Sequence, residues 1–93
     1  MSANARFLHV GIGSVNPPNT ALEKTFSTAM DWIRYSTHSW ILYTNVELDV
    51  WRDRIRNTEG IQASDSFFLS EFSEGEYSGY QQEAVWKWLG KPR

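Results

Sequence analysis

The chain has 93 residues, a formal net charge of −2 at pH 7 and no cysteine. Its length predicts one domain, and the absence of cysteine excludes both a disulfide framework and a thiolate metal site. The slightly acidic balance argues against unaided binding to nucleic acid, because phosphate contacts dominate that affinity and need a basic excess.

Aromatic residues make up 15% of the chain, which is more bulky side chain than so small a core readily hides. We therefore expect some of them to form a surface for self-association. No apolar run approaches the roughly 18 residues of a membrane span, and the start has no hydrophobic segment typical of a signal peptide. These features predict a cytoplasmic protein with one domain over 6–90 and flexible tails over 1–5 and 91–93.

The first predicted strand runs from Arg6 to Gly13, because its apolar residues alternate. The segment Asn16–Asn19 contains two prolines and breaks the chain. Thr20 and Glu23 then have the spacing of a capping box, which predicts the start of a helix. The apolar face of this helix would hold Leu22, Phe26, Ala29, Met30 and Ile33.

Residues 31–44 contain two aromatic and β-branched runs separated by a polar break from Ser36 to Ser39, a pattern that predicts a β-hairpin. Ile33 fits either the helix end or the first strand of the hairpin, and we favour the strand. A second capping-box pattern, Thr44 to Glu47, begins a helix whose apolar residues are Leu48, Trp51 and Ile55.

The last predicted strand is Asp65 to Phe72, followed by a turn and a short amphipathic helix from Gln81 to Leu89 that Gly90 ends. The order is strand, helix, strand, strand, helix, strand and a terminal helix. This order predicts an α+β domain of the ferredoxin-like βαββαβ kind. Its four-stranded antiparallel sheet would carry two helices on one face, and a short C-terminal helix would follow.

Three stretches of the chain resemble the small bacterial and phage proteins called SinR-like. These proteins are in turn similar to the ferredoxin-fold small subunit of CRISPR adaptation and to VapD-type toxins. The similarity rests on a pattern of hydrophobic and aromatic positions. The first stretch is 32–35 together with 40–42, and the second is 44–47 with the helix that continues to Ile55. The third is 65–69 together with 84–89.

The resemblance implies a homodimer with facing sheets and, in some relatives, metal-dependent cleavage of RNA or DNA. In such relatives an aspartate near the end of the first strand gathers Mg²⁺ at the dimer axis. Here the strand ends in Gly11-Ile12-Gly13-Ser14, and no carboxylate occurs before Glu23. Because Mg²⁺ needs anionic oxygen ligands, we expect no catalytic residue, no metal and no cofactor.

The sequence offers a few candidate binding residues. Gly11, Gly13 and Ser14 precede a helix, so their backbone N–H groups could cradle a phosphate, although close packing at the strand end is the simpler explanation. His38 and His9 have no acidic or histidine neighbour at a spacing typical of catalysis or metal binding, so we favour structural or surface roles.

Three groups of charged residues each allow a functional and a structural interpretation. Arg34, among bulky neighbours, could reach phosphates across an aromatic sheet face, but we favour a position at the rim of a dimer. Arg52, Arg54 and Arg56 resemble a basic patch, yet Asp49–Arg52 and Asp53–Arg56 are spaced as ion pairs on a solvated helix face. The acidic C-terminal third could bind a basic partner, and we favour a role in solubility.

Three functions follow from these patterns. We favour a non-catalytic homodimeric binding module of a bacterial or phage defence-related setting, which acts on nucleic acid or on a nucleic-acid-handling protein. One alternative is a toxin-type nuclease that works without the missing aspartate. Another is a small inhibitor or adaptor that docks on a protein through its aromatic and acidic surface. We also expect a homodimer that buries Trp40, Phe68 or Phe72 from the sheet face opposite the helices.

Overall fold

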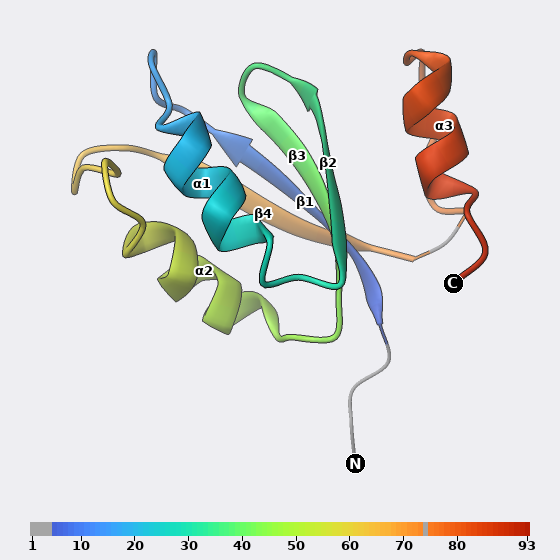
Figure 1. The fold of residues 1–93 in the computed structure, drawn as a ribbon, viewed down its shortest axis with the longest axis horizontal. Coiled ribbons are helices and arrows are strands. Elements are labelled where there is room, and N and C mark those ends of the chain that lie inside the picture. The colour runs from blue at the N-terminus through green and yellow to red at the C-terminus, as the bar shows by residue number, and fades with distance from the viewer. Residues whose placement is uncertain (1–4, 74) are drawn as a thin grey trace.

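The computed structural model describes residues 5–73 and 75–93, and Figure 1 shows how their elements are arranged. The elements in chain order are β1 (Arg6–Ile12), α1 (Asn19–Phe26), β2 (Asp31–Ser36), β3 (Ser39–Thr44), α2 (Leu48–Arg56), β4 (Phe67–Phe72) and α3 (Glu83–Leu89). The strands form one sheet in the order β2-β3-β1-β4, and each neighbouring pair is antiparallel. The protein is therefore an α+β fold with a four-stranded antiparallel sheet and three helices.

The pairing register decides which side chains lie on each face of the sheet. Val10 of β1 lies opposite Trp40 of β3 and Leu69 of β4. Because side chains alternate along a strand, the side chains that share a face with Val10 point toward α1 and α2. These helices contribute Leu22, Phe26, Trp51 and Ile55 to a core that also contains Leu8, Val10, Ile12, Trp40 and Leu42.

Helix α3 lies on the other face of the sheet. Figure 1 shows it across the strands from α1 and α2. Val85 and Leu89 of α3 are buried against Phe7 and Ile41, and partly buried aromatic residues surround this second core. Helix α3 does not cover the whole face, and a hollow stays open beside it. No helix in the described part of the chain is long and apolar enough to cross a membrane.

Helix α1 differs from its prediction at both ends. It begins at Asn19 behind Pro18, and no side chain caps it, so the predicted capping box of Thr20 and Glu23 is wrong. Pro18 is the N-cap residue, and its ring fixes the backbone φ. The helix begins directly after it, one residue before Thr20. The helix ends at Phe26 because the hydroxyls of Ser27 and Thr28 bond to carbonyls of the last turn. Met30 lies beyond the helix and is 60% exposed, and Ile33 lies in β2 as favoured.

Helix α2 begins at Leu48, and the side chain of its N-cap residue, Glu47, makes no capping hydrogen bond. The hydroxyl of Thr44 has a different role from the one its spacing suggested. It accepts hydrogen bonds from the backbone N–H of Val46 and from the indole N–H of Trp51, both at 3.0 Å. Thr44 is 1% exposed, so this buried oxygen fixes the entry of α2 onto the sheet.

Candidate functional site: a groove on the open sheet face

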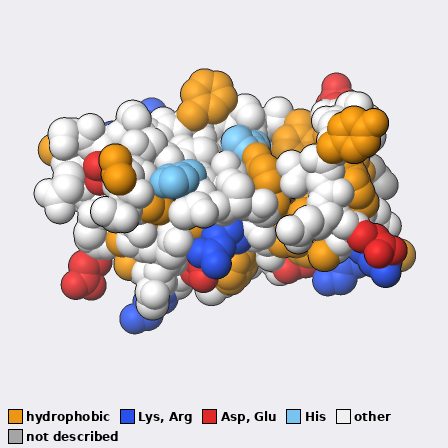
Figure 2. All heavy atoms as spheres, turned by 90° about the horizontal axis from the view of Figure 1, so that it is seen from above, with side chains coloured by type: hydrophobic (Ala, Val, Ile, Leu, Met, Phe, Trp, Pro, Cys, Tyr) orange, Lys and Arg blue, Asp and Glu red, His pale blue; other side chains and the backbone are white. Residues whose placement is uncertain are grey.

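The open part of the sheet face forms a hollow of about 350 Å³, which we call the sheet-face groove. Strands supply its floor, and α3 with the segment before it supplies its wall. The lining residues are His9, Tyr35, Ile41, Ser70, Phe72, Glu76, Tyr77, Ser78, Gln81, Val85, Trp86 and Leu89. Figure 2 shows hydrophobic side chains beside pale blue histidines on the side of the molecule that it presents.

A hydrogen-bonded pair forms the centre of the groove floor. The Nε2 atom of His9 in β1 bonds to the hydroxyl of Tyr35 in β2, and the two ring centroids lie 5.7 Å apart. Burial lowers the pKa of His9 below its ordinary value of 6.5, so the imidazole is neutral near pH 7. The floor is thus uncharged and can both donate and accept hydrogen bonds.

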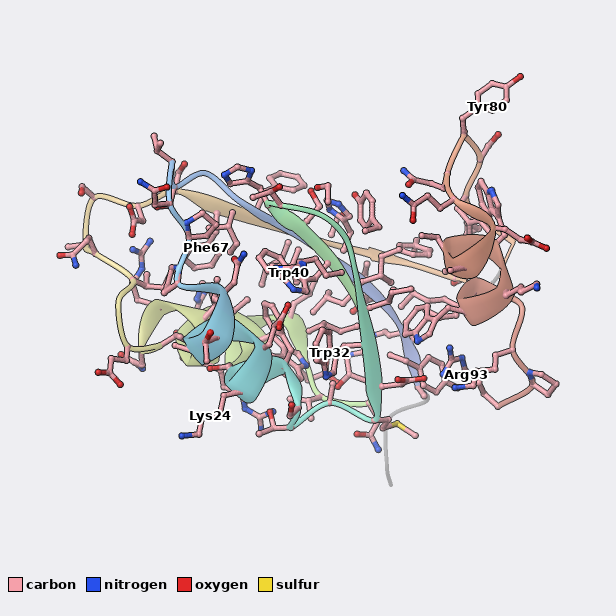
Figure 3. All side chains as sticks on the ribbon, turned by 45° about the horizontal axis from the view of Figure 1, so that its top comes forward. Lys24, Trp32, Trp40, Phe67, Tyr80 and Arg93 are labelled. Carbon is pink, nitrogen blue, oxygen red and sulfur yellow. The ribbon has the colours of Figure 1, made fainter. Side chains whose placement is uncertain are left out.

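Aromatic contacts hold the groove wall against the sheet. Phe72 of β4 stacks on Phe7 at 5.3 Å between centroids, Tyr77 meets the edge of Phe72 at 5.8 Å, and Trp86 stacks on Tyr77 at 6.1 Å. The chain of rings fixes the segment before α3 in place. Tyr80, at the tip of that segment, points into solvent and is fully exposed (Figure 3).

The groove has little charge. Among its described lining residues Glu76 is the one carboxylate, and none is a lysine or an arginine. Glu76 also accepts a hydrogen bond from the backbone N–H of Ser73. An anionic phosphate chain finds no cation here, whereas an apolar segment with an occasional positive charge fits this lining.

The glycine-rich end of β1 is a packing site and not a phosphate cradle. The N–H of Gly13 donates to the carbonyl of Ser66 at 2.7 Å, so it is not available to an anion. A Cβ atom on Gly13 would lie 2.1 Å from Ser66 Oγ, which explains the glycine. Gly11 and His38 line a separate shallow hollow nearby, while Ser14 is outside it. His38 Nε2 lies 3.4 Å from the carbonyl oxygen of Val15.

Arg34 and Trp40 do not lie on the predicted open face. Arg34 lies on the α1 side of the sheet and pairs with Glu23 at 3.6 Å, and Trp40 donates its indole N–H to the same carboxylate at 3.3 Å. Trp40 is 0% exposed and packs on Phe26. Figure 3 shows it between α1 and the strands. The prediction that Trp40 contacts a second protomer is therefore wrong, because its pairing with Val10 turns it inward.

The other two predicted interface residues do lie on the face opposite α1 and α2. Phe68 is 69% exposed. Phe72 is half-buried because Tyr77 covers it. Phe68 therefore offers a free surface, whereas Phe72 is already used within the chain.

The arginines of α2 do not form the two predicted ion pairs. Arg52 pairs with Asp53 at 3.3 Å, and Arg54 lies over the ring of Trp51. Arg56 donates to the carbonyls of Gln62, Ala63 and Asp65. Its guanidinium also covers the ring of Phe67. Asp65 accepts a hydrogen bond from the N–H of Gln62 at 2.8 Å, so this carboxylate helps to order the loop before β4.

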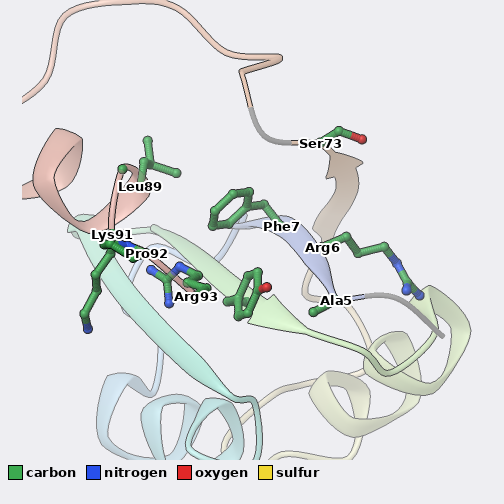
Figure 4. A pocket seen from close by; sticks show the side chains of 10 residues that line it. Ala5, Arg6, Phe7, Ser73, Leu89, Lys91, Pro92 and Arg93 are labelled. Atoms are coloured by element: carbon green, nitrogen blue, oxygen red, sulfur yellow. The ribbon is translucent and has the colours of Figure 1, made fainter. Parts of the chain in front are cut away.

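Residues 91–93, which the sequence predicts as a tail, contact the sheet and α3 through Lys91 and Arg93. The guanidinium of Arg93 lies 4.4 Å from the ring of Trp88, 4.6 Å from Tyr43 and 5.7 Å from Phe7. It also pairs with Asp31 at 3.0 Å. Figure 4 shows Arg93 beside Phe7 in the small pocket between α3 and the start of β1. We call this contact the Arg93 clamp.

The clamp also sets the charge state of Asp31. Desolvation by burial would raise the pKa of Asp31. Hydrogen bonds from Arg93, from the backbone N–H of Trp32 and from Lys91 outweigh this effect and hold the pKa below its ordinary value of 3.8. Asp31 is therefore ionised throughout the neutral range and anchors both basic residues that follow α3.

The described residues contain no group of three or more histidine, aspartate or glutamate side chains placed to hold a metal ion. No family model matches the chain, and comparisons with curated proteins and with solved structures found no match. The geometry and chemistry of the sheet-face groove therefore carry the functional argument.

Proposed function

We propose that this chain is a non-catalytic binding module of ferredoxin-like fold that docks a segment of a partner protein in the sheet-face groove. One observation carries the proposal. The groove combines aromatic walls and a neutral hydrogen-bonding floor of His9 and Tyr35 with a single carboxylate, Glu76, among its described lining residues. Aromatic surfaces with few charges are typical of protein interfaces.

The kind of partner follows from the charge of the groove and from the resemblance to SinR-like proteins. Nucleic-acid-handling proteins carry basic surfaces, and a lysine or arginine in the docked segment would lie near Glu76. Direct binding of RNA or DNA fits less well, because base stacking needs nearby cations to hold the phosphates. The same resemblance supports a bacterial or phage defence-related setting and a homodimer.

The decisive experiment is a pull-down from a bacterial lysate with and without nuclease treatment. We expect the wild-type protein to retain a protein partner after nuclease treatment. Glu76→Lys should lose that partner, because it reverses the charge of the groove. Glu59→Lys makes the same change at an exposed position after α2 and should keep it.

Two results would contradict the proposal. Loss of all bound protein on nuclease treatment would show that nucleic acid bridges the interaction. Equal capture by wild type and by Glu76→Lys, with both variants folded by circular dichroism, would place the binding surface outside the groove.

A further inference from the structure

The two edges of the sheet differ in how well they are protected. The β2 edge has a register shift between Arg34 and Ser36, and Asp31 at its start is covered by the Arg93 clamp. The β4 edge pairs with β1 over Phe67–Phe72 without a bulge, and it contains neither proline nor lysine. Glu71, the one charged residue of β4, is paired with Arg6 within the chain. A regular edge strand with few charges is a template for pairing with another strand.

The register identifies which backbone groups of β4 are free. The Gly13 N–H bonds to the Ser66 carbonyl, which marks this pair as a hydrogen-bonded one. Such pairs alternate along antiparallel strands, so Phe68, Ser70 and Phe72 direct their backbone groups toward β1. Phe67 and Leu69 direct theirs outward, as Glu71 does, and no strand in the described residues pairs with that side.

Helix α2 places one negatively charged and one positively charged side chain beside this edge. Asp49 and Arg52 line a hollow of about 350 Å³ together with Leu48, Phe67, Phe68 and Leu69. Asp49 caps the neighbouring N–H of Val50, and Arg52 has an exposed contact with Asp53. Neither charge is thus held in a buried pair within the chain, and each can meet an opposite charge on another molecule.

We propose that the β4 edge binds the β4 edge of a second copy of this chain, antiparallel about a two-fold axis. The register that uses all of β4 puts Leu69 on the axis and pairs Phe67 of one copy with Glu71 of the other. The two sheets then become one continuous sheet of eight strands. We place Asp49 of each copy opposite Arg52 of its partner, and the two-fold axis makes this contact occur twice.

The arrangement also accounts for Phe68. Its exposed ring lies on the face opposite α2 and would lie beside Ser70 of the second copy, where adjacent strands bring side chains together. Packing of two sheets face to face is less favourable, because α3 already packs on that face. The edge interface does not depend on what the groove binds; it rests on the homodimer of the proposed function and adds the surface through which the two copies meet.

Charge reversal tests the interface through its symmetry. We expect light scattering on the wild-type protein to give about twice the 10.8 kDa monomer mass at high micromolar concentration. Asp49→Arg and Arg52→Asp each place like charges across the axis and should each weaken association about tenfold or more. The double variant restores opposite charges and should associate within about threefold of wild type. Glu59→Arg and Lys24→Glu, away from the edge, are the controls.

Amide hydrogen exchange locates the contact. The amides of Leu69 and Glu71 should become protected as the protein concentration rises, whereas those of Phe68 and Ser70 should be protected at all concentrations. A monomer at millimolar concentration overturns the proposal. So does a dimer whose β4 amides do not respond to concentration, or one in which the charge swap fails to rescue the single variants.

Discussion

The Arg93 clamp makes a sharp prediction about stability. Arg93→Ala removes the cation from Trp88, Tyr43 and Phe7, the ion pair with Asp31 at 3.0 Å and a hydrogen bond of 2.7 Å to the carbonyl of Trp88. The side chain of Arg93 is 12% exposed, so these contacts are well shielded from solvent. We expect the variant to unfold at lower temperature and lower denaturant concentration.

The size of the effect follows from the contacts. A partly desolvated cation–π contact contributes about 1–2 kcal/mol, and a hydrogen bond from a charged group about 1.5–3 kcal/mol. The ordering of an arginine side chain opposes folding by up to about 2 kcal/mol. The free energy of unfolding should therefore fall by about 2 kcal/mol, which in a domain of this size lowers Tm by roughly 8–16 °C.

Urea unfolding and thermal melts of three variants test the reasoning. Lys91→Ala breaks a contact to the same carboxylate, but Lys91 is 57% exposed, so it should lose about 0.5 kcal/mol or less. Arg93→Lys keeps the charge and loses the planar stacking, so it should lie between the two. If Arg93→Ala lowers the free energy of unfolding no more than Lys91→Ala does, the claim that the Arg93 clamp stabilises α3 on the sheet is refuted.

Three further predictions concern acid stability, a buried hydroxyl and catalysis. Because the pKa of His9 is lowered in the folded state, its contribution is full above pH 6.5 and is lost as pH falls through the folded value. The pKa of Asp31 is also lowered, so its contribution to stability is full above pH 3.8 and is lost as pH falls through its folded value. His9→Gln should flatten the upper part of the urea-midpoint profile, and Asp31→Asn the lower part. Thr44→Val leaves the buried indole N–H of Trp51 without its acceptor and should lower the free energy of unfolding by about 1–3 kcal/mol. The exposed Thr20→Val should change it by less than about 0.5 kcal/mol. Purified protein should not cleave labelled RNA or DNA in Mg²⁺ or Mn²⁺. Cleavage that EDTA abolishes, and that the Asp65→Asn variant also lacks, would contradict this prediction.

Local patterns predicted the type and order of the elements because those patterns act over short distances. The polar break of residues 36–39 lies between two β-branched runs, and the structure confirms the hairpin there. The end of α1 was harder to predict, since Ala29 and Met30 continue the apolar period. Two hydroxyls after Phe26 end the helix, and their effect depends on geometry that periodicity does not describe.

The face of the sheet to which each side chain points was harder to predict than the positions of the strands. Residues 40–43 are all apolar or aromatic, so alternation does not say which of them point toward the helices. The pairing of Val10 with Trp40 decides this, and it depends on two strands that are distant in sequence. The groove was missed for the same reason. His9 and Tyr35 meet across the intervening strand β3, and neither residue has a local neighbour that signals the contact.

Helix α3 links the separate features of the molecule. By burying Val85 and Leu89 on Phe7 and Ile41, it covers part of the sheet face and supplies a wall of the groove beside it. The Arg93 clamp ties the residues that follow α3 to Asp31, so it covers the start of the β2 edge. The edge at β4 has no such cover in the described residues. The fold thus separates its two proposed contacts, a partner segment beside α3 and a second copy at β4, and each can be removed by substitutions that leave the other intact.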